Sequence, residues 1–282
     1  MSLDFIPIQP EQNRQFDEEG YLIVRDVLDT ETIESLIAAS DRLIATDIRT
    51  NRQQTKDGLY DGFRNCISMD PAFMPLLTHP KIFSLVVQLL GPHLNLMTSH
   101  LIYRYPDPVD APLSWRLPGW HRDHYTSMRD LGHAHIPRHS LKCAYYLTDL
   151  SEPNSGVTLM APGTNHLTEA MKIPEGQADP ENVVEPLLQP GDCVIFENRT
   201  YHAGAANRSG RTRKAVMFGY GYSWMRPTDY KYQPPEFVEQ LDSMGRYLVG
   251  ELADANEEFS VSGGPNPIQA WSEAAGFFYK AQ

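Results

Sequence analysis

The sequence predicts a mostly β protein with flanking helices, of the jelly-roll type. Between residues 98 and 222 the chain contains short runs rich in β-branched and aromatic residues, and each run is bounded by Pro, Gly, Asp or Asn. The segments before and after this region show helical patterns instead. This spacing is typical of two packed antiparallel sheets. We expect strands at 98–105, 141–147, 157–160, 183–188, 193–196 and 214–222.

Helices are expected on both sides of these strands. Asp29 can cap a helix whose apolar residues fall mostly on one face, and a second helix runs from Pro80 to Gly91. Residues 50–61 between them are polar and contain glycine, which predicts a mobile loop. After Pro235 we expect a helix from Glu236 toward Leu252. Breakers at 263–267 then precede a last helix with four aromatic residues, Trp271, Phe277, Phe278 and Tyr279.

The composition predicts a single domain covering residues 1–282, with a core at about 16–222 and a helical C-terminal extension at about 223–282. A net charge of −12 excludes nucleic-acid binding through a basic surface, and no run approaches the roughly 20 apolar residues of a membrane helix. Three widely spaced cysteines, without a secretory signal or a peroxisomal Ser-Lys-Leu ending, favour a cytoplasmic protein. We expect a monomer or a homodimer.

One motif carries the candidate chemistry. In an extended segment side chains alternate, so His121 and Asp123 project the same way and can share one ion, while Arg122 points elsewhere. His202 follows about eighty residues later. Two imidazoles and one carboxylate on one face of a metal leave other positions open, which is the arrangement of non-haem Fe(II) oxygenases.

Three segments in the same order resemble the phytanoyl-CoA dioxygenase (PhyH-like) family. Residues 16–28 (FDEEGYLIVRDVL) are similar to its amino-terminal signature. Residues 154–166 (NSGVTLMAPGTNH) resemble its NGxLxxxPGSH stretch, and residues 188–209 resemble its lxpGDvvlFhxxxxHgsxxNxS block. The resemblance, from about residue 16 to about 222, implies a double-stranded β-helix (cupin-like) fold.

The resemblance also implies a reaction and its site. Members use Fe(II), 2-oxoglutarate and O2, and release succinate and CO2 while hydroxylating an unactivated C–H bond. Carried onto this chain, the catalytic metal ligands are His121, Asp123 and His202. The family's spacing of eleven residues beyond the distal histidine falls on Arg213, whose planar fork suits the far carboxylate of 2-oxoglutarate, and Arg211 is its competitor.

Further cosubstrate contacts stay open at this point. Thr158 or Thr148 can add a hydroxyl, and Tyr103 and Arg104 lie on a predicted strand whose register decides which way they point. Related halogenases carry a small residue where this chain has Asp123, so hydroxylation, desaturation or ring formation is expected rather than halogenation.

The substrate is expected to be a small organic molecule. Between residues 104 and 142 six cationic side chains outnumber four aspartates, which suggests an anionic substrate held with the help of Arg122 or Arg129. Selectivity is expected in the loops 106–119, 127–140 and 224–235.

Three other readings compete. The stretch 132–139 holds three histidines, His133, His135 and His139, and could bind Zn²⁺. A non-redox cupin-like isomerase and a small-ligand-binding jelly roll without redox chemistry are also compatible with the predicted fold. Consumption of 2-oxoglutarate and oxygen would separate the oxygenase from both.

Overall fold

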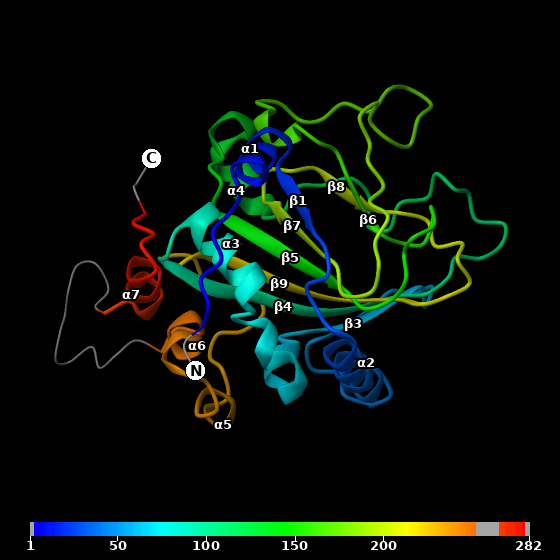
Figure 1. Ribbon diagram of the computed structural model, residues 1–282. Coiled ribbons are helices and arrows are strands. Elements are labelled where there is room, and N and C mark those ends of the chain that lie inside the picture. Colours follow the sequence, from blue (N-terminus) through cyan, green and yellow to red (C-terminus); the bar gives the residue numbers. More distant parts are fainter. Residues whose placement is uncertain (1–2, 252–264, 280–282) are drawn as a thin grey trace.

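A seven-stranded antiparallel sheet forms the centre of the molecule (Figure 1). The computed structural model describes residues 3–251 and 265–279. The strands follow the order β1-β7-β5-β9-β4-β3-β2 across the sheet. Their bounds are β1 Tyr21–Val24, β2 Arg52–Gln54, β3 Tyr60–Arg64, β4 Leu94–Arg104, β5 Ser140–Tyr146, β7 Cys193–Glu197 and β9 Arg213–Tyr222.

A second, smaller layer covers one face of this sheet. It consists of β6 (Thr158–Met160) paired antiparallel with β8 (His202–Gly204) and is extended by isolated bridges such as Met160 to Val184. Buried residues of β5, β6 and β9, including Ala144, Leu159 and Ala215, form one core cluster between the layers. Two antiparallel layers of this kind confirm the predicted jelly-roll class.

Helices cover the opposite face of the large sheet (Figure 1). The second core cluster joins inward residues of α2, α3 and α6 to residues of β4, β5 and β9. The α-helices are α1 Pro10–Glu19, α2 Thr30–Ile44, α3 Pro80–Leu90, α4 Tyr125–Leu131, α5 Pro235–Val238, α6 Ser243–Leu248 and α7 Pro267–Ala274. Short 3₁₀ helices lie at Cys66–Ser68, Pro71–Leu76, His133–His135 and Thr164–His166. No helix within the two described ranges is long and apolar enough to cross a membrane.

Several predicted elements form as expected. The Asp29 carboxylate accepts a hydrogen bond of 2.8 Å from the Thr32 amide, which caps α2, and Gly91 ends α3 with a positive φ. Five of the six predicted strands are present, with ends shifted by a few residues. All three cysteines are buried free thiols.

Other predictions were wrong. Residues 50–61 contain β2 and the start of β3, because the polar residues there pair in a hairpin on the edge of the sheet. Residues 183–188 form two single bridges instead of a strand. The segment after Pro235 forms two short helices, α5 and α6, and residues 252–264 lie outside the described residues. The last helix ends at Ala274, so three of its expected aromatics follow it.

The central strands are buried on both faces, which explains the position of the site. Every residue of β4 is buried. Alternation along β4 sends Tyr103 toward the helices, while His100 and Ile102 line a cavity between the two layers. The register across the sheet therefore decides which side chains face this cavity.

Candidate metal centre

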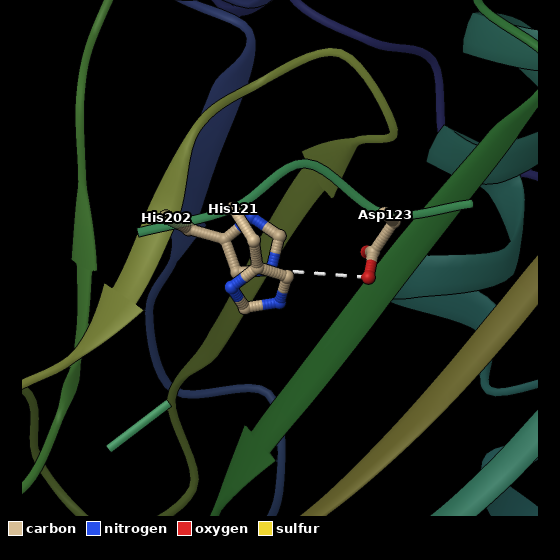
Figure 2. A group of neighbouring side chains, drawn as sticks. All are labelled: His121, Asp123 and His202. Atoms are coloured by element: carbon tan, nitrogen blue, oxygen red, sulfur yellow. Dashed lines mark ion pairs between the residues drawn. The ribbon is translucent and has the colours of Figure 1, made fainter. Parts of the chain in front are cut away.

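His121 and His202 lie side by side because their backbones pair. Each donates its amide N–H to the other's carbonyl oxygen at 3.0 Å, which forms an isolated bridge at the end of β8. The two imidazole centroids are 4.3 Å apart. Figure 2 shows both rings turned toward Asp123. The bridge thus joins two segments that are eighty residues apart in the chain.

Both imidazoles are held in the same tautomer. His121 Nδ1 lies 2.8 Å from the Gly119 carbonyl oxygen, and His202 Nδ1 lies 2.9 Å from the Thr200 carbonyl oxygen. A carbonyl oxygen only accepts, so each Nδ1 carries the proton and each Nε2 keeps its lone pair. Burial lowers the pKa of His202 to about 3, against the opposing effect of Asp123, so this imidazole is neutral at physiological pH. Neutral Nε2 atoms are metal ligands.

Asp123 completes the group. Its Oδ1 lies 3.9 Å from His202 Nε2, and the ligand atoms of His121, Asp123 and His202 all lie within 4.8 Å of one another (Figure 2). Two nitrogen donors and one carboxylate at these separations fit a single ion of the non-haem iron type. The donor set therefore suits Fe(II).

Lys142 of β5 contacts this carboxylate directly. Its Nζ lies 2.8 Å from Asp123 Oδ1. Burial alone would raise the pKa of Asp123, but the charge of Lys142 holds it well below its ordinary value. The sequence analysis counted Lys142 only as one of several local cations. A lysine in the otherwise mostly apolar run of β5 was the signal that could have identified it.

Arg122 points away from the metal group, as the alternation predicts. It is buried, donates to the carbonyl oxygens of Thr164 and Leu167, and stacks on the Tyr201 ring at 4.8 Å. Arg129 is exposed and pairs with Asp130. Neither guanidinium faces the cavity, so the expected role of these two arginines in substrate binding is wrong.

A cavity of about 630 Å³ opens beside the two imidazoles. Its lining includes His121, His202, Lys142, Arg213 and Thr158. The Arg213 side chain is almost fully buried, and its Nε has no partner among the described residues. Burial lowers the pKa of Arg213 from its ordinary value. An unpartnered buried guanidinium at a cavity wall suits an anionic ligand group.

The Arg213 guanidinium also lies over an aromatic ring. Its centre is 6.0 Å from the centroid of the Tyr146 ring, and the Tyr146 hydroxyl donates to Thr158 Oγ1 at 2.7 Å. Arg213 and Thr158 therefore form one polar corner of the cavity, and Tyr146 contacts both without lining it. Tyr146 was not among the residues singled out from the sequence.

The remaining candidates lie elsewhere. Arg211 is exposed and pairs with Asp149 at 3.4 Å. Tyr103 donates to Asp41 at 2.5 Å on the helix-covered face of the sheet. Arg104 is buried in an ion pair with Asp107, and Thr148 accepts from the Lys214 amide. The structure does not place these four residues in the cavity lining. Register turns Tyr103 to the helix-covered face, Arg104 is held by Asp107, and Arg211 and Thr148 lie just outside the strands.

The histidines of 132–139 do not form a metal group within the described residues. His133 and His135 belong to a 3₁₀ helix, and His133 contacts Arg122. His139 is buried against Ser127 and Asn198. The zinc reading therefore has no geometric support.

The sequence comparisons point to one family. The model of the family described as phytanoyl-CoA dioxygenase (PhyH) matches residues 16–215. Dioxygenase andF of Emericella variicolor is 23% identical over 252 residues, with 84% of this chain and 82% of that protein covered. A probable phytanoyl-CoA dioxygenase of Caenorhabditis elegans is 23% identical over 250 residues, covering 76% and 75%.

Solved structures show the same fold. The epimerase SnoN, in complex with Fe3+, alpha ketoglutarate and nogalamycin RO, aligns with a TM-score of 0.60 at 22% identity, over 78% of this chain and 86% of that one. The carbocyclase SnoK from nogalamycin biosynthesis aligns with a TM-score of 0.56 at 19% identity, over 78% and 87%. The family match, the fold and the donor set agree with the sequence prediction. The chain therefore belongs to the phytanoyl-CoA dioxygenase family and is a non-haem iron, 2-oxoglutarate-dependent dioxygenase.

Proposed function

We propose that this enzyme hydroxylates an unactivated C–H bond of a small organic substrate and releases succinate and CO2. The convergence of His121, Asp123 and His202 beside a cavity carries the proposal. The buried cation of Arg213 in the same cavity supports it, because a dicarboxylate cosubstrate needs a fixed partner for its far end.

In this proposal Nε2 of His121, Nε2 of His202 and the carboxylate of Asp123 hold Fe(II). When bound, ferrous iron and 2-oxoglutarate would let O2 act as the oxidant of the substrate C–H bond, with the keto acid decarboxylated to succinate. The backbone carbonyls of Gly119 and Thr200 keep both imidazoles oriented and in the correct tautomer.

The other residues position the reactants. Lys142 keeps Asp123 ionised and fixes one of its oxygens. Arg213 binds the far carboxylate of 2-oxoglutarate, and Thr158, held by Tyr146, adds a hydroxyl to that corner. The apolar cluster between the layers keeps water from this end of the cavity.

The product distinguishes hydroxylation from related oxidations. SnoN and SnoK are named an epimerase and a carbocyclase, and both share this fold. Hydroxylation adds one oxygen atom to the substrate, epimerisation leaves its formula unchanged, and ring formation removes two hydrogen atoms. Retention of Asp123 supports oxygen insertion rather than halogenation, because the carboxylate takes the position that a halide would need.

Residues 16–222 carry this chemistry in our proposal, and residues 223–282 are an extension of the same single domain that acts as a monomer or homodimer. We place the enzyme in the cytoplasm, which the three free, buried cysteines support.

The proposal is tested by anaerobic titration of metal-free protein with Fe(II) and 2-oxoglutarate. Chelation of ferrous iron by the keto acid gives a weak visible charge-transfer band, and oxygen with substrate then releases succinate. We expect the band in the wild type and its loss in His121→Ala. His133→Ala, which alters a histidine outside the metal group, should keep the band. A folded, iron-loaded wild type without the band would favour the non-redox isomerase or the binding protein.

A further inference from the structure

The wall of the cavity that faces the metal group is built by the β2–β3 hairpin and β4. Arg64 and Tyr60 of β3, Gln53 of β2 and His100 of β4 all line the cavity. Arg64 pairs across the sheet with His100, and His100 pairs with Met217 of β9. Residues paired in this way point to the same face, so Arg64 faces the same side as the cavity-lining Met217.

Met217 in turn pairs with Ala144 of β5, two residues from Lys142. Arg64 thus lies three strand spacings, about 14 Å, from the strand that contacts the metal group. A substrate between the two walls would reach the metal with one end and Arg64 with the other.

Four cations line the cavity: Arg52, Arg64, Lys142 and Arg213. Among the described residues that line it, none is Asp or Glu. Arg52 is largely committed, because four of its five N–H groups donate to the two oxygens of Asp61 and to the backbone carbonyls of Thr46 and Ile44. Its charge is already paired with Asp61, so it is a weaker candidate for a ligand than Arg64.

Arg64 is positioned but keeps a free donor group. Its Nε donates to Gln53 at 3.0 Å and its Nη1 donates to Thr98 at 3.2 Å. Nη2 has no hydrogen-bond partner among the described residues, and the side chain is 31% exposed. Asp229 lies 3.8 Å from Nη1, beyond hydrogen-bond distance. That carboxylate already accepts from Thr98 and from the Ser99 amide.

The charges of the loaded site leave one positive charge. Fe(II) with Asp123 has one positive charge, and 2-oxoglutarate with Arg213 has one negative charge, so these cancel. Arg52 and Asp61 cancel, and Arg64 and Asp229 cancel. Lys142 remains, because its partner Asp123 has been counted with the metal. The Lys142 side chain is 23% exposed, so the cavity as a whole has a net positive charge that a monoanion would neutralise.

Resting on the proposed function, we infer that the prime substrate is a monoanion, such as a carboxylate, and that Arg64 is the residue that selects it. The free N–H groups of Arg64 bind the anionic group, and Tyr60 and His100 beside it offer neutral polar contacts. Arg64, rather than Arg122 or Arg129, is thus the residue that we expect to favour an anionic substrate.

The test compares a carboxylate with its neutral amide. 2-Naphthoate and 2-naphthamide are titrated calorimetrically into protein loaded with Fe(II) and saturating 2-oxoglutarate without oxygen, so that Arg213 is occupied. We expect the wild type to bind the naphthoate at least about tenfold more tightly than the naphthamide. This ratio is what one charge-assisted hydrogen-bonded pair can contribute. In Arg64→Gln the two affinities should come within about twofold of each other.

Two further variants complete the design. Arg64→Lys keeps the charge without the fork and should give an intermediate ratio. Arg129→Gln, which changes an exposed arginine away from the cavity, should keep the wild-type ratio. A wild type that fails to prefer the naphthoate, or a preference that survives in Arg64→Gln, would overturn the inference.

The charge-transfer band is read in the same samples. If Arg64→Gln loses the band as Arg213→Ala does, Arg64 serves the cosubstrate and the inference fails. Loss of the band in the wild type would instead contradict the proposed function, whereas the ratio of the two affinities reports on the anion preference alone.

Discussion

The two walls of the cavity are built in different ways. At the metal wall, His121 and His202 are each oriented by a carbonyl two residues earlier in the chain. At the hairpin wall, Arg64 is oriented by Gln53, Thr98 and Asp229, which come from three other segments. The orientation of each metal-binding imidazole is therefore fixed by its local sequence, whereas the orientation of Arg64 depends on long-range strand register.

The largest effect is expected at the metal wall. Asp123→Ala removes the only carboxylate among the described ligand group, and two imidazoles alone hold ferrous iron weakly. We expect the affinity for Fe(II) to fall by more than about 100-fold, since even the loss of a group that only hydrogen-bonds a metal ligand costs about 10- to 100-fold. Equilibrium dialysis with Fe(II) measures this. Asp130→Ala, an exposed aspartate on α4, should bind iron as the wild type does.

If Asp123→Ala kept the wild-type affinity for Fe(II), Asp123 would not be a metal ligand, and the His121–Asp123 motif would not define the metal wall of the cavity.

The second effect separates two arginines of the same strand end. Arg213→Ala removes a buried guanidinium that faces the cavity, and Arg211→Ala removes an exposed one that pairs with Asp149. A two-pronged charge-assisted contact is worth about 3 kcal/mol, so the Kd for 2-oxoglutarate should rise about 100-fold in Arg213→Ala. Titration of the charge-transfer band gives this Kd. In Arg211→Ala it should change by less than about twofold.

If the Kd for 2-oxoglutarate rose equally in both variants, the cosubstrate would bind nearer the exposed Arg211 than this cavity.

Local motifs explain what could be predicted from the sequence. The spacing of His121 and Asp123 and the family spacing to Arg213 need no knowledge of the sheet. The direction of the Tyr103 side chain could not be predicted in this way. A shift of one residue along β4 moves a side chain from the cavity to the helix-covered face. Lys142 and Arg64 depend on the same register, so Lys142 was noted in the sequence only as one of several cations and Arg64 was not noted at all.

The hairpin could not be predicted for a different reason. Residues 50–61 are polar, and strands β2 and β3 are short, so neither shows the alternation of apolar residues that indicates a strand. They form a hairpin because Arg52 and Asp61, nine residues apart, form a buried ion pair across it. This information lies in a contact rather than in a pattern.

A third prediction tests that ion pair. Asp61→Asn leaves Arg52 buried without a counter-charge, and the free energy of unfolding should fall by about 3 kcal/mol. Urea denaturation measures the change. Asp149→Asn alters the exposed pair with Arg211 and should cost less than about 1 kcal/mol.

A loss in Asp61→Asn no larger than that in Asp149→Asn would mean that the hairpin does not depend on its buried charges.

The smallest effect is expected for two tyrosines that lie on opposite faces of the sheet. Tyr60→Phe removes the hydroxyl that lies 2.8 Å from His100 Nε2 at the cavity wall, and Tyr103→Phe removes the hydroxyl that donates to Asp41 on the opposite face. Burial lowers the pKa of His100 well below the ordinary value, so this imidazole is neutral. The bond that Tyr60→Phe removes is therefore one between two uncharged groups. We expect each substitution to lower the free energy of unfolding by about 1 kcal/mol, because Asp41 is half-exposed and its charge is screened by water.

Stability alone does not separate these two tyrosines, but ligand binding does. Only Tyr60 faces the cavity, so only Tyr60→Phe should weaken the binding of 2-naphthoate, by about threefold, which corresponds to part of one neutral hydrogen bond. Calorimetry on the loaded protein measures both variants under identical conditions. If Tyr103→Phe weakened the binding of 2-naphthoate equally, the effect would be transmitted through the whole sheet. Selectivity could then not be assigned to the face of the sheet that lines the cavity.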